Sequence, residues 1–148
     1  MKTRTGMVLL AAGMMGLLTG CATTYRVQAR ATDKASGALA AQVEDEVYGA
    51  LVSRGYAIRK NAAGVRRTTD INLDVTRKET ARLAEWRMYE GKARAEVVSG
   101  KGEVMGKKTF RAQGERSRNQ EEAEESAADG LVRQIDEWLA TVLPPAER

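Results

Sequence analysis

A segment near the middle of the chain alternates between polar and apolar residues, and this pattern limits the possible folds more than any other feature. In 69–78, Ile71, Leu73 and Val75 share one parity, and the residues between them are polar or charged. Such alternation predicts a β-strand with one buried face. A sheet with a polar face is covered on one side only. The rest of the chain must therefore supply elements that cover that side.

Two segments with helical periodicity can provide this cover. The first is 35–54, with Gly55 as a stop signal, and its apolar stripe is Leu39, Val43, Val47 and Leu51. The second begins after Asn119, which predicts an N-cap, and ends before Pro144. Its stripe is Ala123, Ala127, Leu131, Ile135, Trp138 and Val142. Both helices are expected to pack against the apolar face of the sheet.

Further strands are predicted at 56–60, 85–99 and 104–114, with a hairpin turn at 99–103. In 85–99 the apolar parity changes near Tyr89, and one inserted residue in a bulge would explain that change. Trp86 and Trp138 are both expected in the core, and Val104 shares the predicted face of Phe110. The predicted fold is α+β, with a single antiparallel sheet of three to four strands and two helices packed on one face.

The N-terminus has the features of an export signal. Lys2 and Arg4 precede an uncharged run of 12 residues, 7–18. A membrane-spanning helix needs about 20 apolar residues, so this run is typical of a signal peptide. The run leads into Leu18-Thr19-Gly20-Cys21, which resembles the lipobox of bacterial lipoproteins in spacing and position.

The lipobox resemblance implies cleavage between Gly20 and Cys21, a diacylglyceryl group on the Cys21 thiol and an acyl chain on the new amino group. Residue 22 is alanine rather than aspartate, which favours an outer-membrane protein that faces the periplasm. An ordinary secretory signal and an uncleaved anchor are the alternatives. The expected organisation is a signal peptide at 1–20, a flexible tether at 21–34, a domain at 35–142 and a tail at 143–148.

Composition limits the chemistry that the domain can perform. The chain has no histidine and one cysteine, Cys21, so the commonest general base and most metal-ligand sets are missing. The glycines around Lys101 do not have P-loop spacing. The acidic run at 121–125 opens a helix, where carboxylates complement the helix dipole. We therefore expect no enzyme, no catalytic residue, no metal site and no cofactor apart from the covalent lipid on Cys21.

Charge is unevenly distributed along the chain. Residues 54–118 contain 17 basic and 8 acidic residues, whereas 119–142 contains seven acids and one base. Four basic residues are expected on the open face of the sheet: Lys92, Arg94, Lys107 and Arg111. Five arginines are candidates to flank that face: Arg66, Arg67, Arg77, Arg82 and Arg87. The face could bind an anionic ligand, or it could simply be a solvated surface that discourages edge pairing. Nucleic acid is not expected as a partner, because few aromatic residues are interleaved with the lysines and arginines.

The predicted domain resembles small periplasmic lipoproteins in outline, namely the lipopolysaccharide-assembly lipoproteins and the activators of penicillin-binding proteins. The resemblance rests on three pieces: Arg54-Gly55-Tyr56, Gly100-Lys101-Gly102-Glu103-Val104 and Phe110. The expected function is a non-enzymatic, lipid-anchored accessory or scaffold subunit with an envelope protein as its partner. The alternative is a binding module for lipopolysaccharide, a phospholipid headgroup or peptidoglycan through the basic face.

Overall fold

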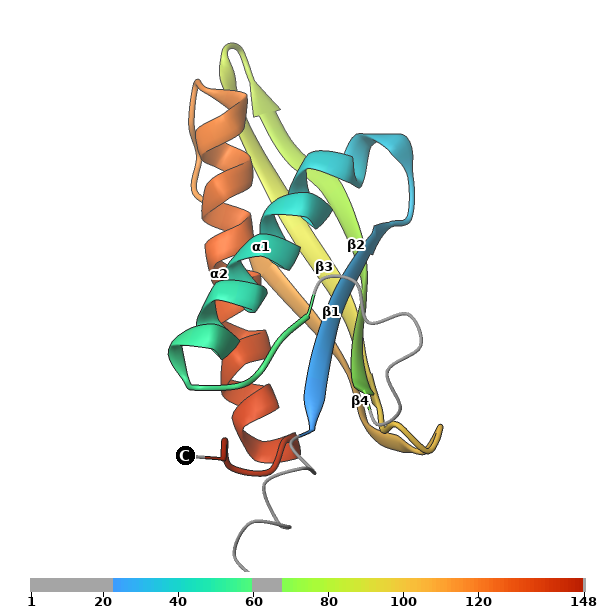
Figure 1. Ribbon diagram of the computed structural model, residues 1–148. Helices are drawn as coiled ribbons and strands as arrows, with labels where there is room; N and C mark the ends of the chain where they lie inside the picture. Colours follow the sequence, from blue (N-terminus) through green and yellow to red (C-terminus); the bar gives the residue numbers. More distant parts are fainter. Residues whose placement is uncertain (1–22, 60–67, 148) are drawn as a thin grey trace, which may run out of the picture.

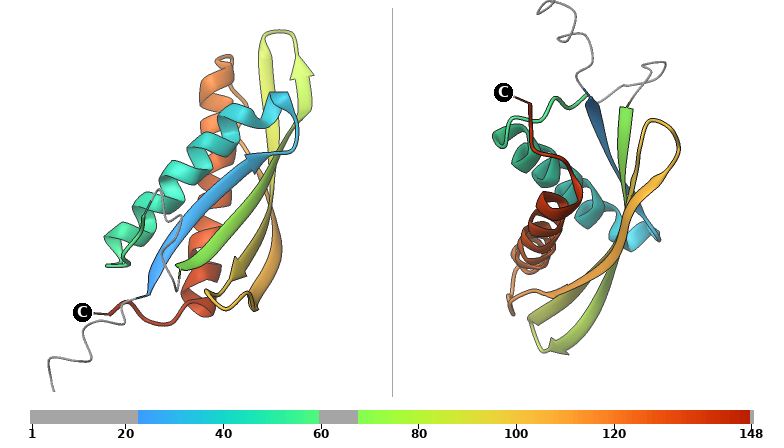
Figure 2. Two further views of the ribbon diagram at one scale, coloured as in Figure 1. Left: turned by 45° about the vertical axis from the view of Figure 1, so that its right-hand side comes forward. Right: turned by 90° about the horizontal axis from the view of Figure 1, so that it is seen from below.

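The computed structural model describes residues 23–59 and 68–147, which form a four-stranded sheet with two long helices on one face (Figure 1). The strands are β1 (Thr24–Ala31), β2 (Thr68–Leu83), β3 (Trp86–Val98) and β4 (Val104–Gln113). The helices are α1 (Gly37–Ser53), preceded by the short 3-10 helix η2 (Lys34–Ser36), and α2 (Gln120–Val142). Seen from below, both helices lie on the same side of the sheet (Figure 2). The predicted α+β class is therefore confirmed.

The sheet is mixed rather than wholly antiparallel. Its strand order is β1-β2-β3-β4. β2, β3 and β4 form an antiparallel meander, and β1 pairs with β2 in parallel, with Val27 opposite Ile71. A parallel pair needs a crossover connection, and α1 lies in the segment that links these two strands.

The prediction of a flexible tether at 21–34 is wrong for residues 24–31, because they form β1. Tyr25 is buried, and Val27 and Ala29 pack against the core on the same parity. The intervening Arg26 forms an ion pair with Asp70 of β2, with 2.8 Å between Nε and Oδ1. The alternation was present in the sequence, but small and polar side chains made it weak. The ordered domain therefore begins at Thr24 and not at residue 35.

The strand predicted at 56–60 is reduced to a single bridge between Ile58 and Tyr25. The amide of Tyr25 donates to the carbonyl of Ala57 at 2.9 Å, and the amide of Arg59 donates to the carbonyl of Tyr25 at 3.0 Å. This short contact runs beside β1 before residues 60–67, which lie outside the described part of the chain.

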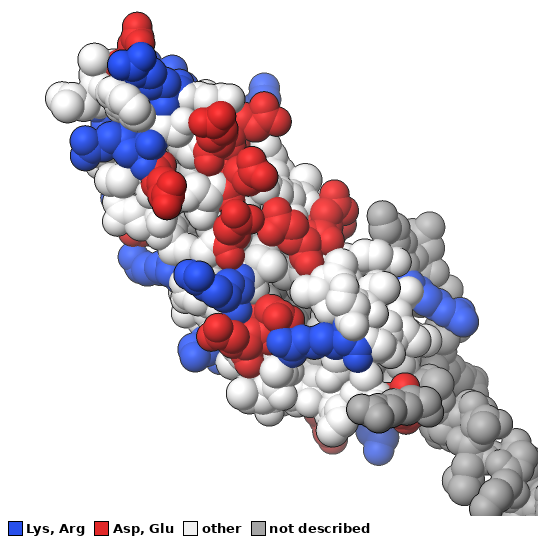
Figure 3. All heavy atoms as spheres, turned by 90° about the vertical axis from the view of Figure 1, so that its left-hand side faces the viewer, with Lys and Arg blue, Asp and Glu red and all other residues white. Residues whose placement is uncertain are grey.

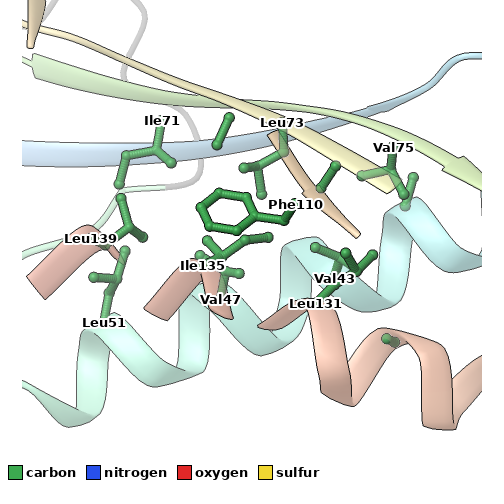
Figure 4. Close-up of a cluster of buried hydrophobic side chains, with 14 of the residues drawn as sticks. Val43, Val47, Leu51, Ile71, Leu73, Val75, Phe110, Leu131, Ile135 and Leu139 are labelled. Carbon is green, nitrogen blue, oxygen red and sulfur yellow. The ribbon is translucent and has the colours of Figure 1, made fainter. Parts of the chain in front are cut away.

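The core lies between the sheet and the two helices (Figure 4). The predicted helical stripes supply it, with Val43 and Leu51 from α1 and Leu131 and Ile135 from α2 fully or almost fully buried. Their neighbours on the sheet are Ile71, Leu73, Val75, Ala93, Ala95, Val97 and Phe110. Burial of such side chains contributes roughly 25 cal/mol per Å² of apolar area removed from water.

Small residues on β3 allow α2 to approach the sheet closely. Gly91 is buried, and a Cβ added there would lie only 2.7 Å from Cδ1 of Leu131. Ala93 and Ala95 continue this parity and are fully buried. The small side chains of β3 therefore leave room for Leu131 of α2.

The positions of two bulges differ from the predicted strand registers. The irregularity near Tyr89 belongs to β2, between Glu79 and Ala81, so β3 keeps one parity throughout. Trp86 consequently lies on the open side and is 38% exposed, which corrects its predicted place in the core. Trp138 is partly buried, with its ring centroid 5.6 Å from that of Phe110.

The second bulge lies in β4, where Val97 pairs with Gly106 but Val98 pairs with Val104. The extra residue, Met105, interrupts the alternation that was expected to bury Val104, and Val104 is 57% exposed. The turn before β4 is the predicted hairpin, because the amide of Gly102 donates to the carbonyl of Ser99 at 2.9 Å. Gly102 has a φ of +84°, a conformation that glycine adopts without strain.

Candidate functional site

The open face of the sheet brings together the four basic residues singled out in the sequence. Lys92 and Arg94 on β3 alternate with buried alanines, and all four basic residues are exposed. Lys92 pairs directly with Arg111 of β4, Arg94 with Thr109, and Lys107 with Glu96. Like charges opposite one another, as at Lys92 and Arg111, disfavour strand pairing in the absence of a counter-charge.

Carboxylates are placed between these basic side chains. Lys107 Nζ lies 3.5 Å from Glu96 Oε2, and Arg111 Nη1 lies 3.7 Å from Glu90 Oε1. Asp74 of β2 stands opposite Arg94 in the register. The surface is therefore an alternating charged face with a basic excess on β3 and β4, and such exposed pairs contribute little to stability.

The flanking arginines do not act as a group. Arg66 and Arg67 lie outside the described residues. Arg82 and Arg87 pair with each other across the distal hairpin, where β2 turns into β3. Arg77 has the parity of Val75, so its side chain lies on the helix side of the sheet rather than on the open face.

Arg77 forms a nearly buried ion pair that sequence reasoning missed. Its guanidinium contacts Glu124 of α2 and lies 4.6 Å above the ring of Tyr89. Gln120 donates a second hydrogen bond to the Glu124 carboxylate at 2.9 Å. Glu124 therefore joins α2 to the sheet and is not simply one of the acidic residues at the helix N-terminus. Its partner is 47 residues away in the chain, so no local pattern marks the pair.

Glu124→Gln should destabilise the fold by about 2–3 kcal/mol, because it leaves the Arg77 guanidinium without its counter-charge. The cost should stay below that of a wholly buried pair, since the two side chains are 16% and 10% exposed. Urea unfolding measures this difference. Glu121→Gln, in the same helix turn but exposed, is the control and should change stability by less than about 0.5 kcal/mol. Equal effects of the two substitutions would contradict the role of the pair.

Acidic side chains gather on the outer surface of the helices, with basic side chains beside them (Figure 3). Burial raises the pKa of Glu46 on α1 above its ordinary value, and the neighbouring charges of Asp129 and Glu125 on α2 raise it further. The amide of Gln42, which donates to Glu46 at 2.9 Å, acts in the opposite direction. The interhelical contact therefore carries a carboxylate that is less stable in its ionised form than it would be in the unfolded chain.

Glu46→Gln should stabilise the protein at pH 7 but have little effect near pH 4. A carboxyl group with a raised pKa supports folding below its unfolded pKa, and that support is lost as the pH rises through the folded pKa. Glutamine removes the loss because it stays neutral, and its carbonyl can still accept from Gln42. Thermal unfolding across this pH range tests the prediction. Asp45→Asn, at an exposed position of the same helix, is the control substitution.

The described residues contain no group of three or more acidic, histidine or cysteine side chains arranged to hold a metal ion. The glycine-rich segment at 100–106 forms the hairpin turn and the start of β4, not a loop before a helix. In 23–59 and 68–147, no helix is long and apolar enough to cross a membrane. The expected absence of an enzymatic activity, a cofactor and a metal stays a prediction.

An open hollow lies at the end of the molecule where the described chain begins. It has a volume of about 610 Å³, and its lining includes Thr23, Tyr25, Lys101, Met105 and Pro144. Cys21 and Gly20, the predicted lipidation and cleavage positions, lie outside the described residues. Thr23 nevertheless fixes the end of the domain at which the preceding residues must arrive.

The fold is shared with bacterial lipoproteins. The minor lipoprotein of Acinetobacter baumannii aligns with a TM-score of 0.60 at 13% identity, covering 84% of this chain and 98% of the other. Lipoprotein GNA1162 of Neisseria meningitidis aligns with a TM-score of 0.50 at 13% identity, covering 80% and 99%. PelC of Paraburkholderia phytofirmans, a dodecamer, aligns with a TM-score of 0.56 at 13% identity, covering 86% and 88%.

No protein-family profile and no curated protein matches the sequence. The structural neighbours therefore establish the fold, and they are compatible with a lipoprotein of the bacterial envelope.

Proposed function

We propose that this chain is a lipid-anchored, non-enzymatic protein on the periplasmic side of the outer membrane, where it serves as an accessory or scaffold subunit of a membrane-associated complex. The observation that carries the proposal is the position of Cys21, directly before a domain whose fold also occurs in bacterial lipoproteins. A covalent lipid confines the domain to the membrane surface and so raises its effective concentration near a membrane partner.

The open sheet face is the proposed contact surface for an envelope protein. It is not covered by the helices, and β4 forms one edge of the sheet. An exposed edge offers backbone groups to another strand, and the charged side chains around it select the partner's orientation. The PelC neighbour, a dodecamer, supports the idea that this fold is suited to the repeated contacts of a scaffold.

Photo-crosslinking in intact cells tests this function. A photoreactive amino acid at Thr109, on β4 opposite Arg94, should capture one defined envelope protein, identified by mass spectrometry. The same group at Ala140, exposed on α2, is the matched control and should not capture it. Identical products from both positions, or no product from Thr109 in the anchored protein, would contradict the proposed contact.

The second candidate is an anionic envelope ligand bound by Lys92, Arg94, Lys107 and Arg111. The observation that favours it is the direct pairing of Lys92 with Arg111, which places two cations side by side. Binding of this kind should weaken steeply as salt screens the charges, and Lys92→Gln with Arg94→Gln should abolish it. Binding of lipopolysaccharide or peptidoglycan that is insensitive to salt and to both substitutions would exclude this candidate.

A further inference from the structure

The short distance between Cys21 and β1 places one particular end of the domain at the membrane. Consecutive Cα atoms are about 3.8 Å apart, so the Cα atoms of Cys21 and Thr23 are separated by at most about 7 Å. Without the expected tether, the proposed lipid emerges beside the first strand. The elements at the same end therefore meet the lipid headgroups as well.

The turn between β3 and β4 lies at this end (Figure 1). Thr23, Lys101 and Met105 line the same hollow. The start of the described chain and this turn are therefore neighbours. We define the β3–β4 hairpin base as residues 99–108. It contains two exposed apolar side chains in succession, Val104 at 57% and Met105 at 41%. The bulge in β4 removes this pair from the core, so it is available to another apolar phase.

Charge in the β3–β4 hairpin base complements an anionic membrane. Lys101, Lys107 and Lys108 are all exposed, and the single acid in this segment is Glu103. Part of the Lys107 charge is offset by Glu96, whereas Lys108 lies at the sheet edge with Nζ 5.5 Å from the Phe110 ring centroid. Exposed apolar side chains among lysines are typical of surfaces that insert at the headgroup boundary.

We infer that the β3–β4 hairpin base is a second membrane contact, in which Val104 and Met105 enter the headgroup region and the lysines meet anionic phospholipid. This inference rests on the proposed anchor at Cys21. Two contacts at one end hold the domain upright on the membrane. The β2–β3 hairpin, with Leu83 67% exposed at its tip, then points away from the lipid. α2 alone, at 23 residues, spans about 35 Å between the two ends.

Fluorescence quenching on the lipidated protein can measure this orientation. The chain has one cysteine, which the lipid occupies, so an introduced cysteine is the only free thiol. A fluorophore is attached to Met105→Cys, Val104→Cys or Leu83→Cys in vesicles of phosphatidylcholine and phosphatidylglycerol that carry quenchers at headgroup depth. Quenching should be several-fold stronger at positions 104 and 105 than at the more exposed position 83.

The outcomes separate the second contact from the anchor itself. Protein that floats with the vesicles but shows no quenching at 104 and 105 overturns the second contact and leaves the anchor intact. Strong quenching at all three positions overturns the upright orientation. Protein that does not float overturns the anchor and the inference together.

Vesicles of different lipid composition test whether the lysines of the β3–β4 hairpin base contact anionic phospholipid. Combined Lys101→Gln, Lys107→Gln and Lys108→Gln should reduce quenching at position 105 in vesicles with phosphatidylglycerol and have little effect in phosphatidylcholine alone. Arg133→Gln, at an exposed position of α2, is the control and should change neither. Equal quenching in the two lipids, before and after these substitutions, would overturn the role of anionic lipid.

Discussion

Cys21→Ala should abolish fatty-acid labelling of the protein and remove it from the outer-membrane fraction. The thiol is the only nucleophile of its kind in the chain, and the lipobox requires it for both acylation and cleavage. Each buried methylene contributes about 0.8 kcal/mol to membrane binding, so two or three acyl chains hold a protein almost permanently. Metabolic labelling, fractionation and intact mass of the protein measure the change.

The control for this experiment is Thr23→Ser, which keeps the thiol and should leave the label, fraction and mass unaffected apart from the substitution itself. The hydrophobic run at 7–18 is too short to span a membrane. If an uncleaved signal nevertheless retained the protein, its mass would be higher and it would carry no fatty-acid label. Cys21→Ala protein that stays in the outer membrane with its fatty-acid label and cleaved mass would contradict the anchor.

The elements that local patterns predict well are those whose apolar side chains are large and regularly spaced. The stripes of α1 and α2 and the alternation around Leu73 are examples. The apolar face predicted for each of these elements lies in the core. β1 follows the same rule, with Tyr25, Val27 and Ala29 on one parity, but alanine carries too little hydrophobic signal to stand out. Its parallel pairing with β2 is a long-range contact that no local period encodes.

Register errors have a different origin. The sequence shows that a parity changes near Tyr89, but an extra residue in either of two paired strands produces the same mismatch. A bulge in β3 would bury Trp86. The structure has the bulge in β2, and Trp86 is exposed. The side of Arg77 was predictable, because it continues the parity of Val75. Its partner Glu124 was not, because the pair depends on how α2 docks.

Packing of α2 against the sheet also makes Gly114 a sensitive position. Gly114→Ala should destabilise the fold by about 3 kcal/mol, at the upper end for overpacked sites. A Cβ there would lie 2.6 Å from the carbonyl oxygen of Ala123 and 2.9 Å from the amide nitrogen of Ala127. Both are backbone atoms of α2, so the helix itself must shift, whereas a flexible side chain could simply rotate away. Urea unfolding, followed by tryptophan fluorescence, measures the loss.

Gly49→Ala is the matched control because it makes the same chemical change with the opposite expected sign. Gly49 is exposed within α1, and an added Cβ would meet nothing within 4 Å. Alanine there should stabilise the helix by roughly 0.5–1 kcal/mol, since it restricts the unfolded chain and has the higher helix propensity. If both substitutions had the same effect, the close approach of α2 at Gly114 would be refuted. Opposite signs would show that α2 is held at this distance because the strand end carries no side chain.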